Sequence, residues 1–332
     1  MRQLILLLLA AGLAFAQGPR IGIVDYYGLH KVPQFKVLAA LGVRDGDPLP
    51  RSKGDAEQRI EQVPGVIEAH LEAVCCDQGK TILYVGVEEK GATHFDLREP
   101  PAEDVQLPGE IATTYRRFLD ASEKAARLGE IAEDLTNGYA LSANVETRDI
   151  QQQFIPIAQH YLPDLRHVLR DSSDEEQRAI AAYVIGYAPD KYAAVDNLQF
   201  ALKDADPGVR ANATHGLKAL AVFARLHPDT GVKIEPTWFI EMLNSLSWAD
   251  RNQAVSMLDL LTEDRDPSAL DQIHARALPS LIEMARWKTL AHALPAYLLL
   301  GRVAGLPQDQ VRDAWSRGDR EWVIAQVERK KK

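Results

Sequence analysis

An internal repeat constrains the fold of this chain more than any other feature of its sequence. The segments VLRDSSDEEQRA at 168–179 and ALKDADPGVRA at 201–211 align, so that Leu169 matches Leu202 and Arg178 matches Arg210. The leucines lie 33 residues apart and the arginines 32. A period of this length is typical of units built from two helices. One such unit cannot bury its apolar face alone, so neighbouring units must stack. The repeat therefore predicts stacked helix pairs over this part of the chain.

The repeat continues more weakly beyond these two copies. The segment MLNSLSWADR at 242–251 is a third copy, in which Arg251 comes later than the period predicts because extra length falls around 226–236. A fourth helix pair is expected at 277–305, although it lacks the spacing from Asp to Arg that marks the first copies.

The segment DPGVR at 206–210 is expected between the two helices of one pair. This pattern resembles HEAT repeats, including the short subtype first named from phycobilisome lyases, and the likeness covers about residues 164–305. The resemblance implies an all-α solenoid, assigned to residues 163–328, of a kind that binds protein partners. No lyase activity follows from the name of the repeat.

The aspartate and arginine of the repeat have two possible roles. Asp206 is expected to cap the second helix of its pair, with Pro207 in the first turn. The arginines, Arg178, Arg210 and Arg251, then lie near the starts of their helices. Either they form a hydrogen-bonded ladder with acidic residues between repeats, or they line a concave groove that binds anionic groups of a partner.

Residues 20–91 have a different pattern, with strands and helices in the order β-α-α-β-β. The expected elements are a strand at 21–26, helices at 32–41 and 53–63, and strands at 70–76 and 81–89. Neighbouring side chains on a strand point to opposite faces, so alternation selects the residues expected to face the core. They are Leu71, Ala73 and Cys75 on one strand of the final hairpin and Leu83, Val85 and Val87 on the other.

This order, with GDPL at 46–49 and PGV at 64–66, resembles a POTRA domain of the outer-membrane-assembly and division-protein type. Further residues that carry the likeness are Gly28, Lys31, Val32, Leu38, Leu41, Gly42, Ile60 and Val63. The resemblance implies a docking module of the bacterial envelope that binds a partner strand at an open sheet edge. It makes Val74 and Cys76 candidate partner-binding residues. A single copy with no following membrane barrel departs from the outer-membrane insertion machinery.

Residues 102–162 are expected to connect the two parts. A long helix is predicted from Glu110 to Leu135, ended by Asn137 and Gly138. A loop at 141–147 and a second helix at about 148–161 follow. The expected fold is therefore an α+β domain followed by an all-α solenoid, mostly α overall.

The segment 1–16 is typical of a signal peptide. Arg2 precedes an apolar run at 4–13 that is too short to cross a bilayer comfortably, and Ala-Phe-Ala at 14–16 is a cleavage pattern. We expect an exported protein, periplasmic or associated with the cell envelope, that is not inserted in a membrane after cleavage. An uncleaved N-terminal anchor is the alternative.

Charge argues against a nucleic-acid partner. The chain has 38 basic and 47 acidic residues, a net charge of -9, whereas proteins that bind nucleic acid usually have a basic surplus. The one basic run, at 329–332, is expected to be a solvated tail.

The segment 74–91 invites two chemical interpretations. Gly-Lys-Thr at 79–81 looks like the end of a phosphate-binding loop, but Val74 stands where a glycine is needed and the lysine enters a strand. Cys75 and Cys76 are the only cysteines. They do not form a Cys-x-x-Cys motif, and a structural zinc site would need about four ligands, whereas only His70 and His94 lie nearby.

Three states of the cysteines remain open. Cys75 could be a core residue with Cys76 on the other sheet face, the two could form a vicinal or intermolecular disulfide, or one could be a metal-binding or catalytic thiol. Free thiols are unusual in an oxidising compartment, which keeps the disulfide in consideration.

The chain has no recognised catalytic motif. Gly-x-Ser-x-Gly, His-Glu-x-x-His and the glycine-rich dinucleotide fingerprint do not occur. The tryptophans are expected to pack helices; they are Trp238, Trp248, Trp287, Trp315 and Trp322. We expect a non-catalytic adaptor or scaffold for proteins, without a cofactor or metal. The alternatives are a thiol-dependent or lyase-like enzyme that uses Cys75 or Cys76, and a structural spacer of the envelope.

Overall fold

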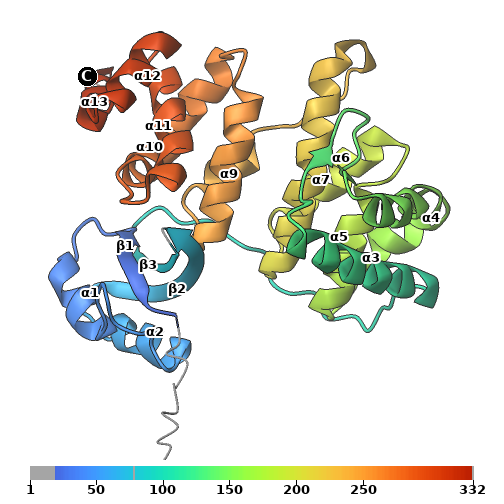
Figure 1. Ribbon diagram of the computed structural model, residues 1–332, viewed down its shortest axis with the longest axis horizontal. Coiled ribbons are helices and arrows are strands. Elements are labelled where there is room, and N and C mark those ends of the chain that lie inside the picture. Colours follow the sequence, from blue (N-terminus) through green and yellow to red (C-terminus); the bar gives the residue numbers. More distant parts are fainter. Residues whose placement is uncertain (1–18, 78, 331–332) are drawn as a thin grey trace, which may run out of the picture.

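The computed structural model describes residues 19–77 and 79–330 of the chain. The expected signal peptide lies outside these residues. The described part is mostly helical, with one small three-stranded sheet near its N-terminal end (Figure 1).

The sheet is mixed and is covered by two helices on one face. Its part of the chain contains β1 (Ile21–Tyr27), α1 (Gln34–Leu41), α2 (Lys53–Glu61), β2 (Val66–Asp77) and β3 (Lys80–Glu89). β3 lies in the centre, with β1 parallel to it on one side and β2 antiparallel to it on the other. The predicted β-α-α-β-β order is confirmed, and the strand with the cysteines lies at a sheet edge.

Local sequence signals define the two helices. Pro33 has an extended backbone, so α1 begins at Gln34, slightly later than expected. Gly42 ends this helix in the left-handed conformation (φ 74°) that glycine adopts without steric cost. Ser52 caps α2 by accepting a hydrogen bond from the Asp55 N–H.

The helical region follows in chain order. Its helices are α3 (Gly109–Arg127), α4 (Val145–Asp171), α5 (Glu175–Ile185), α6 (Lys191–Ala201), α7 (Pro207–Leu226), α8 (Thr237–Met242), α9 (Trp248–Leu261), α10 (Pro267–Ala285), α11 (Leu290–Val303), α12 (Gln308–Ser316) and α13 (Arg320–Lys330). The pairs α6–α7, α8–α9, α10–α11 and α12–α13 each pack together, and α5, α7, α9, α11 and α13 contact one another in sequence. Figure 1 shows this progression from α3 and α4 to α12 and α13.

The predicted connector differs from the structure in two places. α3 ends at Arg127 rather than Leu135, because Gly129 takes a left-handed conformation (φ 76°) and the Glu130 N–H closes back on the Ala125 carbonyl. The following segment forms a two-stranded hairpin of β4 (Glu133–Asp134) and β5 (Leu141–Ser142).

The second helix of the connector continues into the first repeat. α4 runs from Val145 to Asp171, with a break in helical geometry at Tyr161, where the expected helix was to end. Pro163 follows the break, and a proline lacks the N–H that a helix interior requires. The kink therefore divides α4 into two helical stretches.

The sheet packs on both faces. On one face, α1 and α2 cover a core that includes Leu71, Leu83, Val85 and Val87, as alternation predicts. On the other face, Tyr27, Ile82 and Tyr84 join the continuous core of the helical region. The sheet thus lies between α1 and α2 on one side and the α9–α11 end of the helices on the other (Figure 1).

Two predicted core residues are exposed instead. Ala73 and Cys75 have exposed side chains. α2 contacts β2 through Glu57, opposite Leu71, and the helix begins only one turn before Glu57. The hairpin end of β2 therefore extends beyond the helices that cover the rest of the strand.

None of the helices in the described part of the chain combines the length and the apolar character needed to cross a membrane.

Candidate functional site

The first two arginines of the repeat are buried and paired with carboxylates. Arg178 donates from Nε and Nη2 to both oxygens of Asp204, at 2.9 and 2.8 Å. Arg210 donates from Nε and Nη2 to Asp250, at 3.0 and 2.8 Å. Each carboxylate belongs to the next helix pair, so the bonds join neighbouring pairs. This is the ladder geometry, and both arginines are buried.

Each arginine also fixes the loop within its own helix pair. Arg178 Nη1 donates to the Ser172 carbonyl at 2.9 Å, and Arg210 Nη1 donates to the Asp204 carbonyl at 2.8 Å. These donors are directed to fixed acceptors inside the protein. The ladder therefore uses most of the charge and hydrogen-bonding capacity that a groove would offer to a partner.

The third arginine of the repeat, Arg251, and its partner Glu283 also contact residues of the sheet part. Arg251 Nε donates to the Ser245 carbonyl at 2.6 Å, and Nη1 lies 3.4 Å from Glu283 in α10. Burial lowers the pKa of Arg251, an effect that the charge of Glu283 opposes. The Tyr27 ring lies 4.4 Å from the guanidinium, and the Gly28 N–H donates to Glu283 at 3.0 Å.

Aromatic rings hold the sheet against the helices. Tyr84 of β3 stacks on Trp248, with ring centroids 5.1 Å apart and planes 19° apart. Trp287 lies 5.1 Å from Tyr84 and 6.0 Å from Tyr27. The Tyr84 hydroxyl is 2.7 Å from Nδ1 of His292. Trp248 and Trp287 thus pack helix against sheet.

A carboxylate of the sheet caps a helix of the repeats. Glu72 on β2 accepts hydrogen bonds from the Ser247 hydroxyl and the Trp248 N–H, both at 2.7 Å, and from the Ala249 N–H at 3.2 Å. Although burial raises the pKa of Glu72, hydrogen bonds from His70 and Ser247 lower it more, so it lies below its ordinary value. A negatively charged carboxylate at a helix N-terminus is favoured by the helix dipole.

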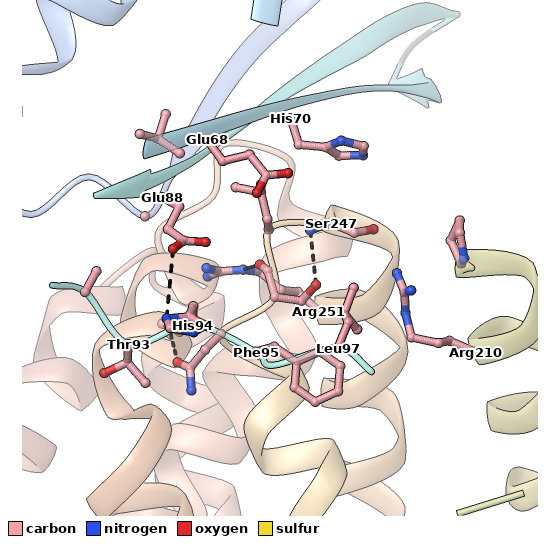
Figure 2. A pocket seen from close by; sticks show the side chains of 18 of the residues that line it. Glu68, His70, Glu88, Thr93, His94, Phe95, Leu97, Arg210, Ser247 and Arg251 are labelled. Carbon is pink, nitrogen blue, oxygen red and sulfur yellow. Dashed lines mark hydrogen bonds and ion pairs between the residues drawn. The ribbon is translucent and has the colours of Figure 1, made fainter. Parts of the chain in front are cut away.

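A pocket of about 290 Å³ lies where the sheet, the segment after β3 and the repeat loops meet (Figure 2). We call it the junction pocket. The side chains that give it chemical character are His30, Glu68, His70, Glu88, His94, Phe95, Arg210 and Arg251.

Histidines and glutamates of the junction pocket form pairs. His94 Nε2 is 2.8 Å from Asp96, and His94 Nδ1 is 3.9 Å from Glu88. A dashed line in Figure 2 joins His94 and Glu88. Partial burial lowers the pKa of His94, but the Asp96 hydrogen bond and the charge of Glu88 raise it above its ordinary value. Glu68 on β2 is the register partner of Glu88 on β3. Burial, and to a smaller extent the charge of Glu88, raise the pKa of Glu68.

The serines at the junction pocket are bound to structural acceptors. The hydroxyl of Ser245 donates to Asp250 at 2.7 Å, that of Ser280 to Asn244 at 2.7 Å, and that of Ser247 to Glu72. Within residues 19–77 and 79–330, no group of three or more His, Cys, Asp or Glu side chains is arranged to hold a metal ion. The hydroxyl groups of these three serines are thus engaged within the protein.

The predicted partner-binding residues of β2 have different environments. Val74 is half-buried against the core of the helical region. Cys75 is exposed and disulfide-bonded, so it is not the core thiol that alternation favours. Cys76 is the other cysteine of the chain and belongs to β2, but its side chain lies outside the described residues.

The outer edge of β2 is covered over only part of its length. The Leu71 N–H donates to Glu57 at 2.7 Å, and the Ala69 N–H donates to Glu61 at 3.4 Å. On an antiparallel strand, alternate N–H groups point to the same side, so the Ala73 N–H also points outward. Side chains of α2 therefore occupy the outer edge of β2 as far as Leu71. The part of the edge that they do not cover begins at Ala73, whose side chain is exposed.

Sequence reasoning missed most residues of the junction. Asp25, Glu72, Tyr84 and His292 are far apart in the chain and meet their partners only through tertiary packing. One signal was present: Glu72 and Tyr84 are opposite each other in register, on the sheet face that the α1–α2 core does not use.

No protein-family model matches the chain, and no curated protein matches it. The functional assignment therefore rests on the geometry of its own residues.

Proposed function

We propose that the chain is a non-catalytic adaptor of the bacterial cell envelope that binds an extended segment of a protein partner along the outer edge of β2. The observation that carries the proposal is that side chains of α2 cover the outer edge of β2 only as far as Leu71. Glu57 and Glu61 accept the N–H groups of the covered stretch, as a partner's carbonyls would. A partner strand beginning at Ala73 would continue the same row of acceptors.

The surroundings of β2 support docking at the edge rather than on a face. As far as Leu71, one sheet face is covered by α1 and α2, and the other by the helices around Trp248 and Trp287. The hairpin end of β2, with its edge beyond Leu71, is thus the part of the strand left for a partner. Natural proteins usually protect exposed edges, because unpaired strands invite association.

The two parts of the chain fit this role. In our proposal the sheet part is POTRA-like, supported by its β-α-α-β-β order with β2 at the edge. The helical part is a HEAT-like solenoid, supported by helix pairs that pack in chain order and by the arginine ladder. The solenoid holds the sheet in a fixed orientation and so presents the edge of β2 to its partner.

Export is supported by two observations. The segment 1–16 has the pattern of a signal peptide. Cys75 is disulfide-bonded, a state that persists in oxidising compartments such as the periplasm.

The test compares two substitutions at one position. Ala73→Pro removes the outward N–H, and a proline is tolerated at a strand edge where the N–H faces solvent. Ala73→Thr keeps the N–H and favours strand structure. In pull-downs from envelope extract, the Thr variant should retain the wild-type partner and the Pro variant should lose it. Equal recovery by both variants, with unchanged melting temperatures, would reject docking at this edge.

A point substitution is preferable to deletion of residues 20–91. The deletion would uncover Trp248 and Trp287, which pack against Tyr84. Newly exposed aromatic surface invites non-specific association. A changed partner list would then not identify the edge.

A further inference from the structure

A second pocket lies at the opposite end of the sheet from the open edge. β1 and β3 are parallel, so their C-terminal ends meet at one side of the sheet. The segments after these ends face α10 across a cavity of about 280 Å³, which we call the basic pocket. Its polar side chains include His30, Lys31, Lys90, Thr93, Arg276 and Ser280.

The positive charge of this pocket is only partly neutralised. Lys31 and Lys90 are exposed, and neither forms an ion pair within the described part of the chain. Arg276 is paired with Glu241 through Nη1 at 3.0 Å, which leaves its other N–H groups for a ligand. His30 lies 3.7 Å from Glu283. In a chain with net charge -9, three cations at one cavity stand out.

The carboxylate of Glu89, which also lines the basic pocket, holds one of its loops in place. Glu89 is 3% exposed, and its carboxylate accepts the consecutive N–H groups of His30, Lys31 and Val32, each at 2.8 Å. Burial raises the pKa of Glu89, but these three bonds lower it more, so the net shift is downward. Successive N–H groups of this kind form an anion-binding concavity. Glu89 fills that concavity and thereby fixes the loop that carries Lys31.

We propose that the basic pocket binds a multivalent oxyanion, a phosphate or polycarboxylate group of a small molecule. Lys31 and Lys90 supply point charges from two fixed loops, and Arg276 approaches from α10 on the other side. Lysine and arginine are the residues that bind such groups in proteins. The cavity is slightly smaller than a typical site for a drug-sized ligand, and the cations that line it come from three segments, which suits a small ligand with several anionic oxygens.

This site is independent of strand docking. Val66 of β2 pairs with Glu89, at the end of the sheet where the basic pocket lies, whereas Ala73 lies toward the other end of β2. A substitution in the pocket therefore leaves the open edge unchanged. The two proposals can fail separately.

The experiment titrates pyrophosphate and citrate, in separate arms, into the full mature chain while amide shifts are followed by NMR. Saturable shifts should centre on Lys31, Lys90 and Thr93. In the double variant Lys31→Gln/Lys90→Gln, affinity should fall by about tenfold or more. Lys36→Gln is the matched control, because Lys36 is an exposed lysine on α1 outside the pocket. It should bind like wild type.

The two arms also distinguish the source of the oxyanion. Preference for pyrophosphate identifies a phosphate ligand, and preference for citrate identifies a polycarboxylate. The proposal is overturned if neither anion gives saturable shifts, or if the double variant and Lys36→Gln bind with equal affinity.

Discussion

Tyr84, on the central strand of the sheet, stacks on Trp248 at the first turn of α9 with ring centroids 5.1 Å apart. This contact joins two residues that are distant in the sequence. Next to it, Glu72 of β2 caps the same helix. The sheet is therefore part of the helical core, and the orientation of the β2 edge is set by the repeats.

Close approach at Gly86 gives a first prediction. A Cβ at this position would lie 2.5 Å from the Leu246 carbonyl oxygen and 2.7 Å from the Tyr27 ring. Gly86→Ala should therefore destabilise the protein by about 1–3 kcal/mol, as overpacking does in other cores. Gly54→Ala in α2 is the control, because a Cβ there meets nothing within 4 Å. Urea denaturation that found equal stability for the two variants would contradict the packed sheet–helix interface.

The arginine ladder gives a second prediction. Arg210→Gln removes the charge partner of Asp250, which stays 2% exposed without compensation. Breaking a buried pair in this way typically costs about 3–5 kcal/mol. The free energy of unfolding should fall by that amount, whereas Arg317→Gln, at an exposed position, should leave it unchanged.

A double-mutant cycle tests whether the Arg210 effect is the pair itself. Asp250→Asn in the Arg210→Gln background should cost less than Asp250→Asn in wild type, since the charge it removes is already unpaired. Independent, additive effects would mean that Arg210 contributes through its carbonyl contacts and not through the ladder.

His94 gives a prediction for pH. Partial burial lowers the pKa of His94, but the hydrogen bond to Asp96 and the charge of Glu88 raise it more. In the folded protein the pKa therefore lies above its ordinary value of 6.5. A raised pKa means that the stability contributed by protonated His94 is fully present below the ordinary value and is lost as pH rises through the folded value.

The stability difference between wild type and His94→Gln should therefore be largest below pH 6.5 and shrink at higher pH. Denaturation at a series of pH values measures it. The same difference measured in an Asp96→Asn background should be smaller and less dependent on pH. A difference that did not change with pH would show that His94 acts without its charge.

The disulfide of Cys75 gives a fourth prediction. Cys76 is the only other cysteine, so a disulfide within one chain must join the two. Intact-mass measurement should show a monomer that gains about 2 Da on reduction. A dimer that dissociates on reduction would indicate an intermolecular bond, and an unchanged monomer mass would indicate free thiols.

The elements of the fold followed from local signals, whereas its tertiary contacts did not. Ser52 before α2 and Gly42 after α1 stand where caps are expected, so those helices were predictable. The end of α3 was predicted too late, because Asn137 and Gly138 also form a helix-ending signal and Gly129 precedes them. Gly129 and Gly138 both adopt the left-handed conformation, and the earlier of the two ends the helix.

The exposed position of Cys75 shows the limit of alternation. Alternation assigns side chains to a face correctly, as Leu71 and Val85 confirm. It does not say how far the covering helices extend along that face. α2 begins at Lys53, one turn before Glu57, and the face pattern does not contain this limit of its cover.

The candidate site was predicted only in part. The ladder partners could be proposed because Asp and Arg recur with the repeat. The junction pocket and the basic pocket could not, since each joins loops of the sheet to helices that come much later in the chain. Such contacts depend on how the two parts pack together, and no local pattern encodes that.

Amide hydrogen exchange of β2 tests the central claim most directly. It is measured on the full chain, alone and bound to the partner recovered in the pull-downs. Strand addition predicts that exchange of the Ala73 amide slows by about tenfold or more on binding, because its outward N–H gains an acceptor. The Leu71 amide, already bonded to Glu57 at 2.7 Å, should change little. Unchanged exchange at Ala73 with the partner bound, or slowing confined to the helices, would contradict docking at this edge.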